Sequence, residues 1–321
     1  MEQIRALFAR RGREMPERNV VQAMFPRGSR VIANPNGTAP GFFYAQGKKI
    51  LAALPGPPRE LLPMLEKQLG PRLCAQRAGN TARRIRRVYR VCGVGESELQ
   101  AWLGPLSQNA AWPELGFLLD EPGEILVILT ARDAEAQLAH ARLKIALQEI
   151  KKMLGPSFIG EVRETLPGAV GKGLHQRHET LATAESCTGG LVSRRITGVP
   201  GASDYFLEGV IAYGNAAKIK RLQVPPALLA RYGAVSEPVA LAMAQGVRRT
   251  AGAAWGLATT GIAGPGGGSR AKPVGTVCLA LVGPGKKTWV QTQRFLGERE
   301  LVQRRAATAV LDALRRRLIE T

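Results

Sequence analysis

The sequence contains few of the residues that most directly mark a metal site, a disulfide framework or a base-stacking surface. Only three histidines and four cysteines occur among 321 residues, and the cysteines form no CxxC pair. This argues against a thiolate zinc site and against structural disulfides, so we expect reduced thiols and no bound metal. Aromatic residues make up 5% of the chain and do not interleave with its basic clusters, as a single-strand stacking surface would require.

Long apolar runs are also lacking. No stretch approaches the roughly 18 apolar residues needed to cross a bilayer, and the first five residues lack the apolar core of a signal peptide. We therefore expect a soluble, cytoplasmic protein without a membrane partner.

Acidic residues are scarce relative to basic ones. The chain has 45 Lys and Arg against 25 Asp and Glu, a formal net charge of +20, which favours association with polyanions. The main clusters are Arg83–Arg84 with Arg86–Arg87, and Arg315–Arg317. Charge runs on helices usually face water, so we expect solvated surfaces here. A nucleic-acid surface is the alternative that the sequence does not favour.

Length and composition predict several α/β domains. With 45% hydrophobic residues the chain can bury a core, and 321 residues exceed what one core usually supports. Shifts in composition divide it into a Pro- and Gly-rich segment at 1–78, a small α+β module at 79–160 and a layered α/β domain at 161–321. In the last segment we expect strands at 181–185, 206–213, 257–260, 275–282 and 288–295, and helices at 164–177, 188–197, 215–222 and 298–319.

The segment around Ser186 places a hydroxyl where an apolar strand ends and a small-residue turn opens a helix. Amides at the N-terminus of that helix could stabilise an oxyanion. The alternative interpretation is that Ser186 or Thr188 only caps the helix. Cys187 is a competing nucleophile, but His140, His175 and His178 lie on helices or their edges and are more typical of solvated residues, which leaves a Ser-His triad poorly supported.

Lysine is therefore the better candidate for a base. Tyr213 and Lys218 follow another strand across Gly214-Asn215, and a desolvated lysine can act as a general base for serine. Taken alone, Lys218 is more typical of a surface lysine. The loop from Gly261 to Ser269 is glycine-dense and could form an anion nest, although it lacks both Walker A and dinucleotide-binding spacing.

Together these segments resemble the C-terminal domain of the competence/damage-inducible CinA family. The matching motifs are Ala184-Glu185-Ser186-Cys187-Thr188-Gly189-Gly190, Gly209 to Asn215 with Lys218, Gly233 to Pro238, Thr260 to Pro265, Lys272 to Val277, and Gly297-Glu298-Arg299 with Arg304. The resemblance implies a three-layer α/β/α domain with a mixed sheet and a nicotinamide-nucleotide amidase activity. This activity converts nicotinamide mononucleotide to nicotinic acid mononucleotide and ammonia, as part of pyridine nucleotide salvage.

The resemblance also implies roles for individual residues. Ser186 would be the nucleophile, Lys218 the base and Tyr213 its partner, in an enzyme that needs no cofactor and forms a homodimer. The substrate and the oxyanion would be surrounded by Cys187, Thr188, Gly189, Ser236, Thr260, Ala263, Gly264, Pro265, Gly266, Thr276 and Arg304.

Residues 1–160 resemble the same family through Gly37 to Gly41, Leu54 to Pro58 and Gly93-Val94-Gly95-Glu96-Ser97. The family's N-terminal domain resembles molybdopterin-binding proteins, and this sequence begins after its Gly-Gly-Leu-Gly-Pro-Thr segment and metal-binding aspartates. We therefore expect a truncated domain, from a miscalled start or a decayed gene, without the ADP-ribose pyrophosphatase activity associated with the family. A residual pyrophosphatase and a non-catalytic nucleic-acid-associated competence protein are the alternatives to the amidase.

Overall fold

The computed structural model describes residues 2–10, 12, 14–47, 49–75, 83–109, 111–285 and 287–319. The chain divides into two compact units, Met1–Thr81 and Ala82–Thr321. The boundary that the sequence predicts near residue 78 lies outside the described residues. Among the described helices, none is both long enough and apolar enough to cross a bilayer.

The first unit is built around a three-stranded antiparallel sheet in the order β1-β2-β3. Its elements are α1 (Glu2–Arg10), η1 (Glu17–Ala23), β1 (Arg30–Ile32), β2 (Gly41–Gln46), β3 (Lys49–Ala53), α2 (Pro58–Met64), η2 (Leu65–Leu69) and α3 (Gly70–Ala75). β2 and β3 lie between two turn-rich runs of the sequence, at 34–40 and 54–57. A small core of Ile32, Phe43, Met64 and Leu69 holds this unit together.

The second unit begins with a four-stranded antiparallel sheet in the order β5-β6-β4-β7. Its strands are β4 (Arg83–Cys92), β5 (Glu114–Glu121), β6 (Glu124–Asp133) and β7 (Phe158–Glu161), with α4 (Glu96–Leu103), η3 (Gly104–Gln108), α5 (Ala136–Leu154) and η4 (Gly155–Ser157). Alternate residues of β4 and β6 pack against α4 and α5, as expected for strands with one buried face.

The rest of the second unit is a three-layer α/β/α domain on a five-stranded mixed sheet, in the order β12-β11-β10-β8-β9. Its strands are β8 (Leu181–Glu185), β9 (Phe206–Ile211), β10 (Trp255–Gly261), β11 (Thr276–Val282) and β12 (Thr288–Arg294). β8, β9 and β10 run parallel, whereas β11 and β12 pair antiparallel. The predicted fold class is confirmed.

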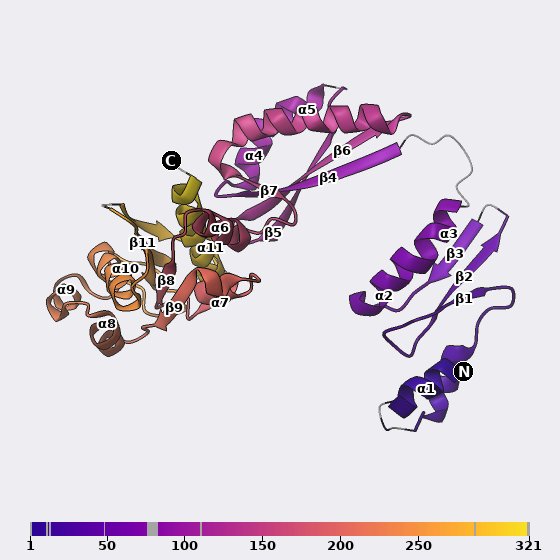
Figure 1. Cartoon of the computed structure of the whole chain (residues 1–321), viewed down its shortest axis with the longest axis horizontal. Helices are drawn as coiled ribbons and strands as arrows, with labels where there is room; N and C mark the ends of the chain where they lie inside the picture. The colour runs from indigo at the N-terminus through magenta and orange to yellow at the C-terminus, as the bar shows by residue number, and fades with distance from the viewer. Residues whose placement is uncertain are drawn as a thin grey trace. The chain divides into compact units, whose positions relative to one another are not determined.

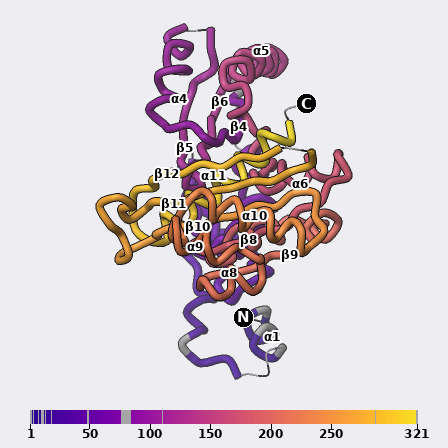
Figure 2. Tube along the Cα trace, turned by 90° about the vertical axis from the view of Figure 1, so that its left-hand side faces the viewer, coloured from indigo at the N-terminus to yellow at the C-terminus, as the bar shows by residue number. Residues whose placement is uncertain are grey.

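Helices cover both faces of this sheet (Figures 1 and 2). Successive residues of the strands face the two helical layers alternately. One face packs leucines and valines against α6 (Leu166–Gln176), α7 (Leu191–Thr197) and α11 (Arg299–Ile319). The other face is lined mainly by alanines and packs against α8 (Asn215–Leu222), α9 (Pro226–Tyr232) and α10 (Glu237–Ala251). Figure 2 looks onto this second layer, with the strands behind it in sheet order.

Two expectations need correction. The helix predicted from 188 begins only at Leu191, because Gly189 and Gly190 have left-handed φ values of 63° and 99° that interrupt a helix. The Arg315–Arg317 cluster is not a solvated face. Arg315 is 3% exposed and ion-paired with Asp312, and Arg317 lies over the Trp289 ring.

Candidate active site

Ser186 lies at the carboxyl end of β8, in the turn that leads to α7. Its backbone amide donates to the Thr259 carbonyl of the neighbouring strand at 2.9 Å, and its own carbonyl accepts from the Gly189 amide at 3.1 Å. The residue is only 7% exposed. Ser186 is therefore held in a rigid turn, and Gly190, not Ser186, is the N-cap residue of α7.

The adjacent Glu185 holds this turn in place through hydrogen bonds to its buried carboxylate. Its buried carboxylate accepts hydrogen bonds from the Thr188 hydroxyl (2.7 Å) and the amides of Gly190 (3.0 Å) and Val192 (3.1 Å). It also accepts from the amide (2.8 Å) and hydroxyl (2.7 Å) of Ser193. Five donors, several from the first turn of α7, satisfy a charge that would otherwise be costly to bury. The sequence analysis gave Glu185 no role.

Lys218 approaches Ser186 from α8. Its side chain is 1% exposed, and its Nζ lies 3.2 Å from the Ser186 Oγ, 2.9 Å from the Ala212 carbonyl oxygen and 3.0 Å from the Tyr213 carbonyl oxygen. Burial lowers the pKa of Lys218, because a desolvated ammonium is disfavoured relative to the neutral amine. The expectation of a surface lysine is thus overturned.

The three neighbours of this amine define what its neutral form can do. A neutral amine has two N–H groups and one lone pair, and carbonyl oxygens can only accept hydrogen bonds. The two carbonyls of Ala212 and Tyr213 therefore take both N–H groups. The lone pair is left for the Ser186 hydroxyl, which then donates its proton to Nζ. This is the arrangement required of a general base and its nucleophile.

The alternative nucleophile and bases fit this site less well. Burial raises the pKa of the Cys187 thiol to about 12, which keeps it protonated near neutral pH. The Cys187 carbonyl accepts from Gln303 Nε2 at 2.7 Å, which fixes the peptide beside Ser186. His140, His175 and His178 are all exposed, as predicted.

The phenol of Tyr213 lies at the mouth of the site and does not bond Lys218. The side chain is 58% exposed, and its hydroxyl accepts from Arg299 Nη2 at 2.7 Å. Arg299 Nη1 donates to the Gly264 carbonyl at 2.8 Å, so one guanidinium links the two sides of the mouth. Only the backbone carbonyl of Tyr213 contacts Lys218. Arg299 is a pocket residue that the sequence analysis did not select.

A pocket of about 270 Å³ opens over Ser186 and Lys218. Of the residues predicted to surround the substrate, the structure brings to its lining Cys187, Thr260, Ala263, Gly264 and Gly266, with Tyr213 at its mouth. The Thr260 hydroxyl donates to the Ala234 carbonyl at 2.8 Å. From Ala263 to Gly268 no backbone amide donates a hydrogen bond within the described chain. These amides remain available to an anion.

Six predicted residues do not line this pocket: Thr188, Gly189, Ser236, Pro265, Thr276 and Arg304. The hydroxyls of Ser236 and Thr276 donate to the nearby carbonyls of Gly233 (2.9 Å) and Pro273 (2.7 Å). Thr188 contributes through the buried network of Glu185 and lies 2.7 Å from the Thr259 hydroxyl.

Arg304 points away from the site and pairs with Glu121 at 2.6 Å. It follows Arg299 by five helical residues, which turns it about 140° around the axis of α11. Arg299, at the first position of that helix, is the arginine that lines the Ser186 pocket.

The fold and the site together define a multidomain α/β protein whose C-terminal three-layer domain buries a serine and a lysine side by side. Residues 163–318 match the model of the CinA C-terminal domain, and residues 86–160 match that of the damage-inducible protein CinA KH domain. The sequence analysis had described the latter only as a small α+β module.

Comparison with whole proteins gives the same family. A Symbiobacterium thermophilum protein that carries the name of a competence-damage inducible protein is 44% identical over 99% of this chain and 77% of its own length. A CinA-like protein of Dictyoglomus thermophilum is 39% identical over 99% of this chain and 76% of its own. A crystal structure of a CinA superfamily protein from Klebsiella pneumoniae is 35% identical, with a TM-score of 0.47 over 49% of this chain and 97% of that one. The chain belongs to the CinA family.

Proposed function

We propose that the C-terminal domain is a nicotinamide-nucleotide amidase that hydrolyses nicotinamide mononucleotide to nicotinic acid mononucleotide and ammonia. The observation that carries this proposal is the buried Lys218 amine, 3.2 Å from the Ser186 hydroxyl, with two carbonyls occupying its N–H groups.

In the acylation step, the Ser186 Oγ attacks the carboxamide carbon of the substrate while Nζ of neutral Lys218 takes the hydroxyl proton. The amide nitrogen then leaves as ammonia after receiving that proton from the Lys218 ammonium. An ester between Ser186 and the nicotinoyl group remains. Water attacks this ester and gives one proton to Lys218, which passes it to the departing Ser186 oxygen. The product leaves as a carboxylate after its remaining proton is released to solvent.

Substrate recognition in this proposal relies on the anionic phosphate. Arg299 offers a guanidinium at the mouth of the pocket, and the loop from Ala263 to Gly268, whose Gly264 carbonyl it contacts, offers backbone amides that donate no hydrogen bond within the described chain. A charge-assisted contact from Arg299 takes the place that the sequence analysis gave to Arg304.

The direct test is release of ammonia from nicotinamide mononucleotide. Ser186→Ala and Lys218→Ala should each lower kcat by about 10³-fold, since both remove the nucleophile or its base. Lys218→Arg should be equally impaired, because a guanidinium cannot lose its proton in a protein. Lys220→Ala, an exposed lysine on the same helix, is the matched control. Wild-type turnover in both Ser186→Ala and Lys218→Ala would refute the assignment.

The phosphate contact makes a separate prediction about Arg299. Arg299→Gln should raise KM for nicotinamide mononucleotide about tenfold, the loss of one charge-assisted bond. Turnover of free nicotinamide, which has no phosphate, should change much less. Arg304→Gln should leave KM for the nucleotide unchanged. If Arg304→Gln raised KM and Arg299→Gln did not, the phosphate would be assigned to Arg304 instead.

A further inference from the structure

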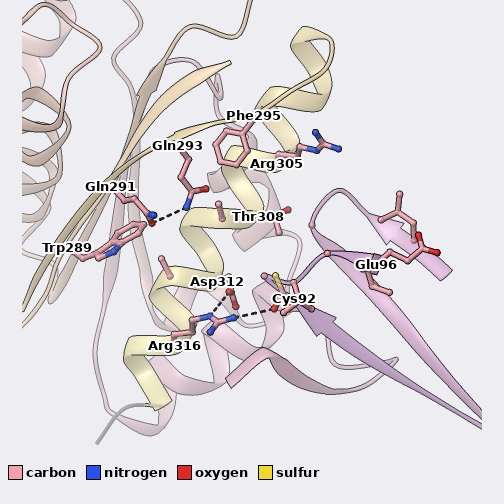
Figure 3. Close-up of a pocket in the computed structure, with 18 of the residues that line it drawn as sticks. Cys92, Glu96, Trp289, Gln291, Gln293, Phe295, Arg305, Thr308, Asp312 and Arg316 are labelled. Carbon is pink, nitrogen blue, oxygen red and sulfur yellow. Dashed lines mark hydrogen bonds and ion pairs between the residues drawn. The ribbon is translucent and has the colours of Figure 1, made fainter. Parts of the chain in front are cut away.

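A second cavity, of about 640 Å³, lies in the same unit but shares no lining residue with the Ser186 pocket. It is bounded by β12, by one face of α11 and by the turn between β4 and α4 (Figure 3). Its volume falls within the range of about 300 to 1,000 Å³ that is typical of small-molecule sites. The proposed amidase reaction uses none of its residues.

The wall formed by β12 carries two aromatic and two amide side chains. Trp289, Gln291, Gln293 and Phe295 are alternate residues, so they share one face of this edge strand and its end. Figure 3 shows them projecting toward α11, with Trp289 and Phe295 at the two ends of the row. Phe295 stays partly exposed although it packs against the core, which leaves aromatic surface open to a planar ligand. The Trp289 ring is covered on one face by the Arg317 guanidinium, which lies 4.9 Å from the ring centroid.

The two glutamines are coupled to each other. Gln293 Nε2 donates to Gln291 Oε1 at 3.0 Å. This bond leaves the Gln291 NH₂ group as a donor and the Gln293 Oε1 as an acceptor, side by side between the aromatic residues. A heterocycle edge that presents an acceptor next to an amino group would complement this pair. Adenine presents such an edge through N7 and N6.

Most charges in the cavity are already paired. Asp312 accepts from Arg316 Nε at 2.7 Å and from Arg315, which neutralises its carboxylate. Arg317 donates to the Ala313 carbonyl at 2.8 Å and lies over the Trp289 ring. Arg305 donates through Nη1 to the Leu296 carbonyl at 2.6 Å and has no carboxylate partner among the described residues. One available guanidinium suits one phosphate. The exposed Glu96 on the opposite wall makes a polyanion a poor fit.

The turn between β4 and α4 explains a motif that the amidase does not. Gly93 has a φ of 75°, and a Cβ at this position would lie 2.7 Å from both Asp312 Oδ2 and Arg316 Nη2. The Arg316 Nη2 also donates to the Cys92 carbonyl at 3.3 Å. Glycine therefore lets the Cys92–Glu96 turn close onto α11 and complete the wall of the cavity.

We propose that this cavity is a binding site for an adenine nucleoside monophosphate. The base stacks on Phe295 and pairs with the Gln291–Gln293 amides, and the phosphate reaches Arg305. Stacking, amide pairing and the Arg305 guanidinium together favour this ligand over a lipid, which would leave the two amides unpaired, and over a nucleic acid, which would meet Glu96.

Isothermal titration of the full chain with AMP tests the proposal, with quenching of tryptophan fluorescence as a second readout. We expect saturable binding of AMP, weakened about tenfold or more by Phe295→Ala and by Arg305→Gln, since each removes one recognition element. Phe295→Tyr keeps an aromatic ring and should retain binding if Phe295→Ala is unstable. Arg294→Gln, on the opposite face of β12, is the matched charge control and should bind AMP as wild type does. IMP, whose base edge reverses the donor and acceptor, should bind less tightly than AMP.

Several results would overturn the proposal. They are absence of saturable AMP binding, equal binding by Arg305→Gln, and displacement of AMP by an equal concentration of inorganic phosphate. Loss of AMP binding in Arg299→Gln but not in Arg305→Gln would place the nucleotide in the Ser186 pocket instead. Ser186→Ala should bind AMP normally, so this test is independent of the amidase assignment.

Discussion

At the scale of single residues, the chemistry of the site depends on the burial of one amine. Lys218 is drawn into the protein by its place on the inward face of α8, beside Leu222, and its polar contacts are carbonyl oxygens rather than carboxylates. A carboxylate partner would stabilise the ammonium, whereas carbonyls and burial allow the neutral form. Whether a lysine can act as a base therefore depends on its surroundings.

This burial predicts the pH dependence of the amidase. Lys218 must be neutral to accept the Ser186 proton, and its lowered pKa places the neutral form at lower pH than an ordinary lysine would. We expect kcat/KM for nicotinamide mononucleotide to rise with pH through one ionisation below the usual lysine range. A pH-rate profile measures it; an inflection at the ordinary lysine pKa, near about 10.4, would contradict it.

The same pKa shift has a consequence for stability. Between the lowered pKa of folded Lys218 and the ordinary value, the unfolded chain binds more protons, so the free energy of unfolding rises with pH in that window. In Lys218→Met this contribution is lost, and stability relative to wild type should fall as pH rises. Denaturant unfolding at several pH values measures the difference, with Lys220→Met as the exposed control.

Two residues of the site were beyond the reach of sequence reasoning. Glu185 lies in the motif but acts through five hydrogen bonds to a turn whose path depends on the left-handed Gly189 and Gly190. Arg299 reaches the pocket over Ser186 only because α11 begins where this residue can bond the Gly264 carbonyl. Spacing along the chain cannot distinguish Arg299 from Arg304, since the choice depends on how the helix is rotated.

At the scale of elements, periodicity and caps predicted the C-terminal domain well. The strand at Leu181–Glu185 and the helix at Asn215–Leu222 have the predicted bounds, because an apolar run and a Gly-Asn start mark them clearly. Parallel strands β8 and β9 also explain why Ser186 and Lys218 meet, since both follow the carboxyl ends of neighbouring strands.

The module before this domain was predicted less completely. The sequence did not predict β5, because its side chains do not alternate regularly between apolar and polar. The Pro122-Gly123 turn that joins it to β6 is nevertheless a hairpin signal. β7 spans only four residues, and its pairing with β4 comes from a segment far along the chain. Such long-range pairing is decided by tertiary packing rather than by local pattern.

The alanine-lined face of the sheet leads to a prediction about packing. α10 lies so close to β10 that a Cβ at Gly256 would be 2.1 Å from the Ala244 carbonyl oxygen, a backbone atom that cannot rotate away. Gly256→Ala should therefore destabilise the domain by about 1 to 3 kcal/mol, the usual cost of overpacking. Thermal unfolding measures this loss. Gly104→Ala, where the added Cβ would lie 4.0 Å from Gln100 Cγ, should have little effect, and equal stability of both variants would contradict the close approach.

At the scale of the whole molecule, the basic residues fall into two groups, one buried in ion pairs and one exposed on the surface. In the first group, Arg90 and Arg195 both pair with the buried Glu124, and Arg195 also donates to Thr308 on α11. These bonds join the four-stranded sheet to the C-terminal domain. The second group lies on surfaces, as at the exposed Arg84 and Arg86 of β4.

The surface part of the charge predicts weak, nonspecific binding of duplex DNA. With a net charge of +20, phosphate contacts release counterions, so affinity should fall at least about tenfold between about 50 and about 200 mM salt. Fluorescence anisotropy with a labelled duplex measures this dependence. The double variant Arg84→Gln with Arg86→Gln should bind less tightly, whereas Arg84→Lys with Arg86→Lys, which keeps the charge, should not. Ser186→Ala should bind as wild type does. Tight binding that persists at physiological salt and prefers one sequence would instead identify a dedicated nucleic-acid reader, with base contacts that a spread of surface charge cannot provide.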